Sequence, residues 1–227
     1  MKDGSIPPSL EPSEPRRVLR QTLLTRRPRF FDAQLVLLWL GLMIVSSWSA
    51  WSDARLIEWG ATIGPRILES GEVWRLITAQ FLHSDLGHLL SNGYMIFILG
   101  LFVHAYFGWQ VFPLAALGGG ALVNLLTIAS YPPEARLLGA SGVVYWLAGF
   151  WLVLFLLIER QRSWPRRLLR VAGVGLLILF PSEFQPNVSY LAHSWGLILG
   201  VLSGVIFFVL RFKWIRSFEV FDIEYGG

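Results

Sequence analysis

Residues 139–158 read GASGVVYWLAGFWLVLFLLI, and this run identifies the class of fold. It holds no charged side chain over twenty residues, and about 20 apolar residues in a helix cross the hydrocarbon core of a bilayer. The first four residues of the run are small and include a hydroxyl group, because Ser141 lies between Gly139 and Gly142. The run therefore predicts a membrane-spanning helix from Ser141 to Ile158 that begins with a hydroxyl group.

The composition of the whole chain supports a membrane protein. Hydrophobic residues make up 54% of the 227 residues and charged residues only 15%, whereas a soluble domain carries about 25% charged residues. The chain has no cysteine, which excludes disulfides, thiolate zinc sites and cysteine nucleophiles. The net charge of +4 does not indicate nucleic-acid binding, because the basic residues cluster beside the hydrophobic runs.

Five further runs are long and apolar enough, or nearly so, to be spans: 33–51, 86–107, 111–131, 168–180 and 191–210. Run 168–180 is short, because thirteen helical residues rise only about 20 Å. Three arginines at its start, Arg166, Arg167 and Arg170, could extend it by snorkelling to the interface. The sequence predicts an all-α bundle of six transmembrane helices in one domain, residues 31–211.

The segments outside the spans have distinct characters. Residues 1–30 are polar and basic with several prolines and no apolar core, so they predict a disordered tail and not a signal peptide. Residues 212–227 form a C-terminal tail. About 35 residues, 52–85, connect the first two spans with mixed aromatic, aliphatic and glycine residues. We expect this long amphipathic loop to pack on the outer membrane surface.

The distribution of Lys and Arg predicts the orientation of the spans. Seven of these basic residues precede the first span. Five lie between the fourth and fifth spans or at the start of the fifth, and three follow the sixth. The loops on the other side hold four, Arg55, Arg66, Arg75 and Arg136. Cytoplasmic loops carry the excess of positive charge, so we expect both termini in the cytoplasm.

Four polar side chains then fall in one layer near the outer face. The second, fourth and sixth spans all begin there, and their first turns hold His88 with Asn92, Ser141, and His193. Polar residues inside spans are costly and tend to mark function. Ser141 lies among the unpaired N–H groups of a helix N-terminus, which suit a developing oxyanion. The spacing also places Tyr145 one turn below the serine.

The sixth span predicts close contact with a neighbouring helix. After His193 it carries Gly196, Gly200 and Gly204, and such stripes of small residues let membrane helices touch backbone to backbone. This contact would bring the imidazole within hydrogen-bond reach of Ser141. No span has an Asp or Glu in its interior, so a serine hydrolase built this way uses a dyad and not a triad.

Three motifs resemble those of the rhomboid family of intramembrane serine proteases. WRLITAQFLHSDLGHLLSN at 74–92 is similar to the segment that leads into the second rhomboid helix. GASGVVYWLAG at 139–149 resembles the GxSG nucleophile motif, and AHSWGLILG at 192–200 resembles the AHxxGxxxG helix. They occur in the family's order and cover under a fifth of the chain. A lone GxSG is a weak signal, and all three on their expected helices are a strong one.

The resemblance implies a role for each residue of the polar layer. Ser141 would attack the peptide carbonyl, and His193 would take its proton and return it to the leaving amine. The backbone N–H of Ser141 with the side chains of His88 and Asn92 would form the oxyanion hole. Tyr145 would stack on His193 and hold its ring.

The resemblance also implies supporting residues, and it has one departure. Trp74 and Arg75 would anchor the first loop and His83 would hydrogen-bond within it. Gly139 and Gly142 would shape the turn, and Gly196 the contact between the fourth and sixth helices. Trp195 stands where the family often has a small residue. We expect its ring to face lipid or a neighbouring helix, because a ring between the two helices would separate the dyad.

Other interpretations remain open on the sequence alone. Ser141 could be a helix cap, His193 a buried histidine satisfied by a carbonyl, and His88 and Asn92 interhelical hydrogen-bonding residues. A catalytically silent rhomboid-like adaptor or chaperone is the main alternative, although silent relatives lack the serine or the histidine. A transporter is disfavoured by the shallow polar layer, and a metalloprotease by the absence of an HExxH motif.

The expected activity is that of an endopeptidase acting inside the membrane. Its substrates would be single-span membrane proteins that enter sideways between helices, with Gly- or Pro-containing segments unwinding most readily. The bilayer is the other partner. We expect no cofactor, no metal and no nucleic acid, and a location in the bacterial inner membrane.

Overall fold

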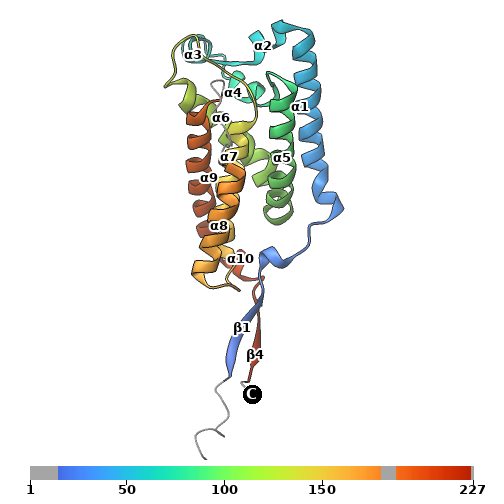
Figure 1. The fold of residues 1–227 in the computed structure, drawn as a ribbon, viewed down its shortest axis with the longest axis vertical. Coiled ribbons are helices and arrows are strands. Elements are labelled where there is room, and N and C mark those ends of the chain that lie inside the picture. Colours follow the sequence, from blue (N-terminus) through green and yellow to red (C-terminus); the bar gives the residue numbers. More distant parts are fainter. Residues whose placement is uncertain (1–14, 180–187, 226–227) are drawn as a thin grey trace, which may run out of the picture.

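The protein is an all-α membrane bundle, seen in a computed structural model that describes residues 15–179 and 188–225. Five helices are long and apolar enough to cross a bilayer within these ranges. They are α1 (Gln34–Ser52), α5 (Leu86–Phe107), α6 (Ala116–Ile128) with the π-helical turn η5 (Gln110–Ala115) before it, α7 (Ser141–Ile158) and α9 (Tyr190–Leu210). Figure 1 shows these helices side by side along the long axis.

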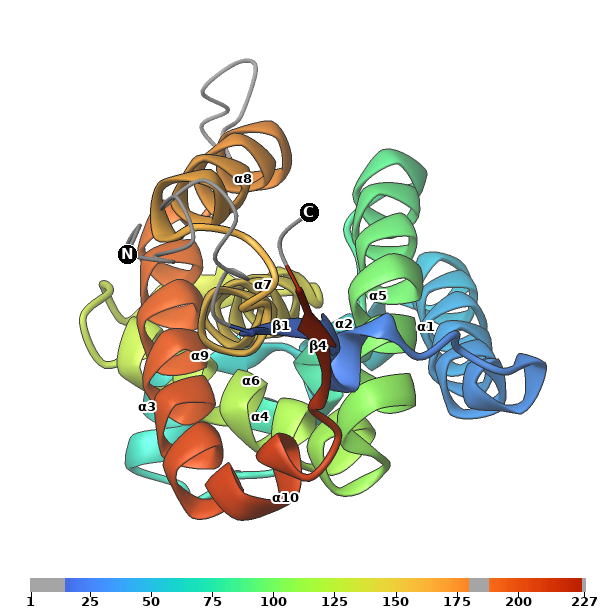
Figure 2. The ribbon, with the colours of Figure 1, turned by 90° about the horizontal axis from the view of Figure 1, so that it is seen from below.

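Helix α7 is the central helix of the bundle. Figure 2 shows it enclosed by α5, α6, α8 and α9. More than half of α7 is buried inside the protein, against 17% of α9 and 28% of α1. The helix that carries Ser141 is therefore held by protein on most sides, which is what a site of fixed geometry requires.

Helix α8 (Trp164–Leu179) corresponds to the short fifth run and is not among the five candidate spans found within the described residues. It begins four residues earlier than the apolar run, so its first turns include basic residues. Arg167 donates to the carbonyl of Leu156 and lies over the ring of Trp164. Phe180, the last residue of the predicted run, lies outside the described residues. The six-helix count remains a prediction.

The long loop between α1 and α5 is built from short elements across one end of the bundle (Figure 1). They are α2 (Ala54–Gly60), β2 (Thr62–Ile63), α3 (Gly64–Leu68), α4 (Arg75–Thr78) and η4 (Ala79–Phe81), and β2 pairs with β3 (Arg136–Leu137). Arg75 is buried at their centre, donates to the carbonyls of Glu58 and Ala61, and pairs with Glu72. Trp74 stacks on Trp59.

The opposite end holds a two-stranded ribbon that the sequence does not predict. Strand β1 (Arg16–Gln21) pairs antiparallel with β4 (Val220–Glu224). Between β1 and α1 lie the short turns η2 (Leu23–Thr25) and η3 (Phe30–Ala33), and α10 (Phe212–Arg216) lies between α9 and β4. The ribbon extends away from the bundle (Figure 1). Part of the tail predicted to be disordered over 1–30 thus forms a strand from Arg16, which pairs with β4. Residues 1–14, 226 and 227 lie outside the described ranges.

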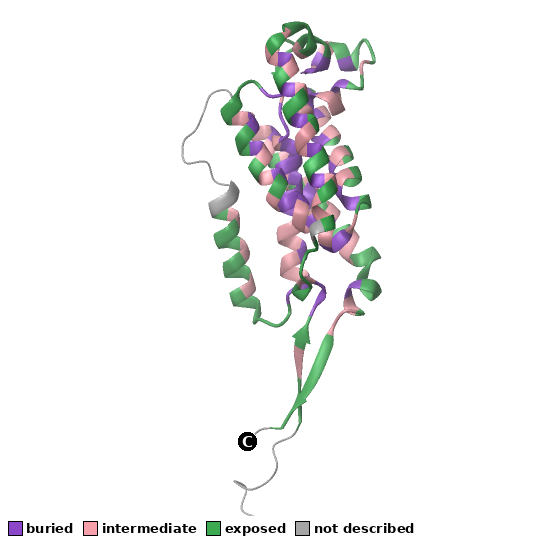
Figure 3. Cartoon of the chain, turned by 90° about the vertical axis from the view of Figure 1, so that its right-hand side faces the viewer, coloured by how far each residue is buried: buried purple, intermediate pink, exposed green. Residues whose placement is uncertain are grey.

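Large apolar side chains are exposed along the sides of the bundle. Leu38, Val45 and Trp48 of α1 and Leu202 and Val209 of α9 are each more than half exposed. Figure 3 shows the buried residues gathered inside the bundle, with exposed residues on the outward helix faces and on the ribbon. Such a surface suits lipid and not water.

Candidate active site

The turn before Ser141 is closed tightly by neighbouring residues. Gly139 has a φ of 108°, a backbone conformation that L side chains rarely adopt. A Cβ on it would lie 2.6 Å from Cε1 of the His88 ring. The Gly139 N–H donates to the carbonyl of Ala79 at 2.9 Å. The turn therefore needs glycine both for its backbone angle and for the close approach of the His88 ring to Gly139, two residues before Ser141 at the start of α7.

Helix α5 supplies an imidazole and a carboxamide beside this turn. Asp85 caps the helix by accepting from the His88 N–H at 2.8 Å, and this bond holds the pKa of Asp85 below its usual value. Asn92 follows one turn later and is buried, with 6% of its surface exposed. Its Nδ2 lies 3.5 Å from the place of a Gly139 Cβ and has no hydrogen-bond partner within the described ranges.

An unpaired buried amide is costly, about 1–3 kcal/mol in stability. Buried polar groups in folded proteins are nearly always paired, so each exception requires an explanation. A donor that points beside the Gly139–Ser141 turn without a partner is what an oxyanion hole contains before its substrate arrives.

Helix α9 supplies a second imidazole on the other side of α7. The rings of His193 and Tyr145 are stacked, with centroids 4.0 Å apart and planes 11° from parallel. Because Tyr145 lies one turn after Ser141 on α7, the His193 ring lies within about a turn of the serine. Ser189 caps α9 by accepting from the Ala192 N–H, which fixes the start of the helix.

Glycines bring the backbones of α7 and α9 into contact. A Cβ on Gly196 would lie 2.8 Å from the carbonyl oxygen of Gly142, and one on Gly200 would collide with the carbonyl oxygen of Trp146. Gly149 of α7 faces the carbonyl of Leu197 in the same way. The glycine stripe of α9 therefore meets α7, as the spacing predicts. Trp195 is half-buried and does not separate the two helices.

His83 is the third histidine near the turn and lies in the loop after η4. It is fully buried, and burial lowers its pKa to about 3, with a smaller contribution from His88. Its ring is 5.2 Å from the ring of His88. Its Nε2 accepts from the Ala140 N–H at 3.4 Å, and its Nδ1 lies 3.1 Å from Oγ of Ser47 on α1. His83 is therefore neutral and connects the loop to the turn.

The predicted residues fall into two groups. Ser141, His193, Tyr145, His88 and Asn92 lie around the turn with Gly139, Gly142, Gly196 and His83. Trp74 and Arg75 contact residues of the first loop and do not reach this group. Ser47 is a contact that sequence reasoning missed, because nothing in its residue type separates it from other serines of α1. Among the described residues, no three His, Asp or Glu side chains gather as a metal site.

Comparisons with known proteins agree with the three motifs. The sequence profile of the family described as "Rhomboid domain" matches residues 70–210. Rhomboid-like protease 2 of Toxoplasma gondii is 30% identical over 150 residues, 66% of this chain and 53% of that protein. The putative rhomboid protease YdcA of Bacillus subtilis (strain 168) is 31% identical over 137 residues, 59% of this chain and 66% of that protein.

A plant relative shows the same limits of overlap. RHOMBOID-like protein 5 of Arabidopsis thaliana is 29% identical over 147 residues, 62% of this chain and 46% of that protein. The matched part thus spans about half to two thirds of the length of these relatives. The family profile covers more than half of the chain, including α5, α6, α7, α8 and α9. The chain belongs to the rhomboid family.

Proposed function

We propose that the chain is a serine endopeptidase that cleaves transmembrane segments of other membrane proteins, with Ser141 as nucleophile and His193 as base. The observation that carries the proposal is the position of the His193 ring, stacked on Tyr145 one turn from Ser141. Its relatives include proteins named as rhomboid proteases, which supports proteolysis as the class of reaction.

The chemistry follows the residues around the turn. Oγ of Ser141 attacks the peptide carbonyl carbon while His193 takes the hydroxyl proton. The C–N bond then breaks, and His193 gives that proton to the leaving amine. Water hydrolyses the acyl-enzyme with His193 again as base and releases the serine. Neither α7 nor α9 contains Asp or Glu, so Tyr145 takes over the orienting of the imidazole that a carboxylate performs in a triad.

The oxyanion of each tetrahedral intermediate needs hydrogen-bond donors that are already in place. The backbone N–H of Ser141 at the N-terminus of α7, the ring of His88 and the unpaired Nδ2 of Asn92 are the donors we assign to it. One such donor is worth about 2.7–4 kcal/mol of transition-state stabilisation in a soluble protease. The lack of a protein partner for Nδ2 of Asn92 among the described residues fits this assignment.

A fluorophosphonate probe tests the dyad. The wild-type protein in detergent should be labelled, and Ser141→Ala and His193→Ala should both abolish labelling. Ser194→Ala is the matched control, because Ser194 is exposed next to His193 in the chain and its hydroxyl donates to the Tyr190 carbonyl of its own helix. We expect it to label as the wild type does. Labelling that persists in Ser141→Ala and His193→Ala would exclude the mechanism, and a correctly folded wild type without labelling would indicate a silent adaptor.

The substrate class requires a separate measurement. The site lies beside the first turns of spans, so we infer single-span membrane proteins whose helices unwind at Gly or Pro near the membrane surface. Protein reconstituted into liposomes should cleave a model single-span substrate with such a segment, and Ser141→Ala should not. Cleavage of soluble peptides only would contradict the inference.

The orientation belongs to the same proposal. We infer that the ribbon end is cytoplasmic and the Ser141 end faces the outside of a bacterial inner membrane. The pairing of β1 with β4 supports a common side for both ends of the described chain. The excess of Lys and Arg at that end supports the cytoplasm as that side.

A further inference from the structure

We propose that Ser47 of α1 is a positioning residue for the nucleophile turn and acts through His83. This inference rests on the proposed role of Ser141. Ser47 lies outside the matched family region, on the first span, and is fully buried. Its Oγ lies 3.0 Å from the carbonyl oxygen of Phe81 and 3.1 Å from Nδ1 of His83.

The donors and acceptors of this chain of contacts can be assigned one by one. The Ala140 N–H can only donate, so Nε2 of His83 must accept. A neutral imidazole then carries its proton on Nδ1 and donates it to Oγ of Ser47. The Ser47 hydroxyl keeps its own proton for the carbonyl of Phe81. Each contact permits only one direction, and together they select the Nδ1–H tautomer of His83.

The selected tautomer holds the residue that precedes the nucleophile. Ala140 is the N-cap of α7, and its N–H is fixed by His83, while the N–H of Gly139 is fixed by the carbonyl of Ala79. Two consecutive N–H groups of the turn are thus bonded to the η4 region. With the proton on Nε2 instead, the ring would present a donor to the Ala140 N–H, and the turn would shift.

Without the Ser47 hydroxyl, the preference for this tautomer weakens. Nδ1–H would lose the Ser47 hydroxyl and keep only the Phe81 carbonyl as an acceptor, so the ring would exchange its proton position or rotate. A misplacement of about 1 Å at a reacting group costs about 100-fold in rate. The effect should appear in kcat, because Ser47 is fully buried and reaches the turn only through His83.

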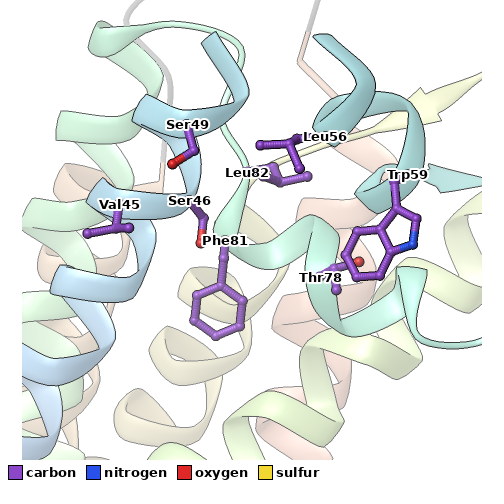
Figure 4. Close-up of a pocket in the computed structure, with 8 residues that line it drawn as sticks. All are labelled: Val45, Ser46, Ser49, Leu56, Trp59, Thr78, Phe81 and Leu82. Carbon is purple, nitrogen blue, oxygen red and sulfur yellow. The ribbon is translucent and has the colours of Figure 1, made fainter. Parts of the chain in front are cut away.

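Two other serines of α1 provide matched controls. Ser46 and Ser49 line a cavity of about 280 Å³ between α1 and the first loop, together with apolar residues such as Leu56, Trp59 and Leu82. Figure 4 shows their hydroxyl groups beside this cavity. Ser47 faces the interior on the same turn of helix. Ser49→Ala removes the same hydroxyl group from α1 without touching His83.

The first test is kinetic. Ser47→Ala should lower kcat for a model substrate in liposomes by about 10- to 100-fold with KM changed less than twofold. Ser47→Thr, which keeps the hydroxyl, should recover most of the activity, and Ser49→Ala should match the wild type. In a His83→Gln background, Ser47→Ala should cost less than threefold further. A Ser47→Ala variant with wild-type kcat, or an equal loss in Ser49→Ala, would overturn the proposal.

The second test does not depend on catalysis. The chain has four histidines, so ¹⁵N-histidine labelling in detergent gives few signals, and the spectrum of His83→Gln assigns those of His83. The wild type should show the Nδ1–H tautomer, and Ser47→Ala should show Nε2–H or a mixture. The Nε2–H tautomer in the wild type would refute the proposed action of Ser47 through His83 on Ala140. The tautomer can be read without enzyme activity. It therefore separates failure of the proposed role of Ser47 from failure of the proposed mechanism at Ser141.

Discussion

Asn92 and Asn124 are equally buried, each with 6% of its surface exposed, and they differ in their hydrogen bonds. Nδ2 of Asn124 donates to the carbonyl of Leu76 at 3.0 Å. Nδ2 of Asn92 has no partner within the described ranges and lies beside the Gly139 turn. The first amide stabilises the resting fold. The unpaired amide of Asn92 lowers the stability of the fold, and we propose that it stabilises the oxyanion in the transition state.

Removing each amide should therefore give opposite results. Asn92→Leu keeps side-chain volume, so unfolding in detergent should show equal or higher stability while kcat falls about 100- to 1000-fold. Asn124→Leu leaves the Leu76 carbonyl with its bond from Gln80 alone and should lose about 0.5–1.5 kcal/mol of stability, with kcat of the folded fraction within threefold. Activity and unfolding measured on one preparation decide this. Equal loss of activity in both variants would contradict the assignment of Asn92 to the oxyanion.

Residue chemistry explains which parts of the site could be predicted. Histidine, asparagine and serine at the starts of apolar spans are conspicuous because such side chains are costly there, and His88, Asn92, Ser141 and His193 stood out on that ground. Ser47 lies within a span that contains several serines. Which of them faces His83 depends on the rotation of α1 and on the path of the first loop, and neither follows from a local pattern.

At the scale of elements, the contact between α7 and α9 sets the distance between the Ser141 hydroxyl on α7 and the His193 imidazole on α9. The stripe of Gly196, Gly200 and Gly204 predicts that α9 touches another helix. The reciprocal glycine, Gly149 of α7, ends the motif GASGVVYWLAG, but nothing in its spacing indicates a contact with α9. In the structure a Cβ on it would collide with the carbonyl of Leu197. Only the packed pair of helices shows that α7 and α9 each place a glycine against the backbone of the other helix.

A methyl group at this contact should separate the helices. In Gly200→Ala the new Cβ meets the backbone carbonyl of Trp146, which no rotamer change can relieve. We expect a loss of about 1–3 kcal/mol of stability and of at least about 100-fold in kcat. The matched control is Gly173→Ala on α8, where, among the described residues, no atom of another element lies within 4 Å of the new Cβ. It should keep full activity, and equal behaviour of the two variants would exclude the contact.

At the scale of the whole molecule, the ribbon joins segments about 200 residues apart. Arg20 pairs with Asp222 and Glu224, and Arg17 lies over the ring of Phe221. Each segment alone is short, charged and typical of a flexible tail, so local composition predicts disorder. Pairing becomes possible because both segments lie at the same end of the bundle (Figure 1). Two-stranded ribbons are only marginally stable in water, and the exposed ion pairs add little.

The absence of cysteine allows this pairing to be tested by cross-linking. Val18 and Asp222 are direct partners in the ribbon, and Cα atoms of opposed residues lie about 4.5–5.5 Å apart, within the range that a disulfide spans. Val18→Cys with Asp222→Cys should therefore oxidise readily, with kcat within twofold because the ribbon lies at the far end from Ser141. Val18→Cys with Glu224→Cys is displaced by two residues and should cross-link much more slowly. Equal rates would exclude the observed register.

The single variant Asp222→Cys then reports the side of the membrane on which both ends lie. In intact bacterial spheroplasts a membrane-impermeant maleimide should not label it until the membrane is broken. Arg55→Cys is the reference on the opposite end, because the Arg55 side chain at the start of α2 is 91% exposed, and it should label at once. The expected contrast follows from charge, since the ribbon end carries most of the Lys and Arg. Immediate labelling of Asp222→Cys together with protection of Arg55→Cys would reverse the orientation and place the Ser141 end at the cytoplasmic face.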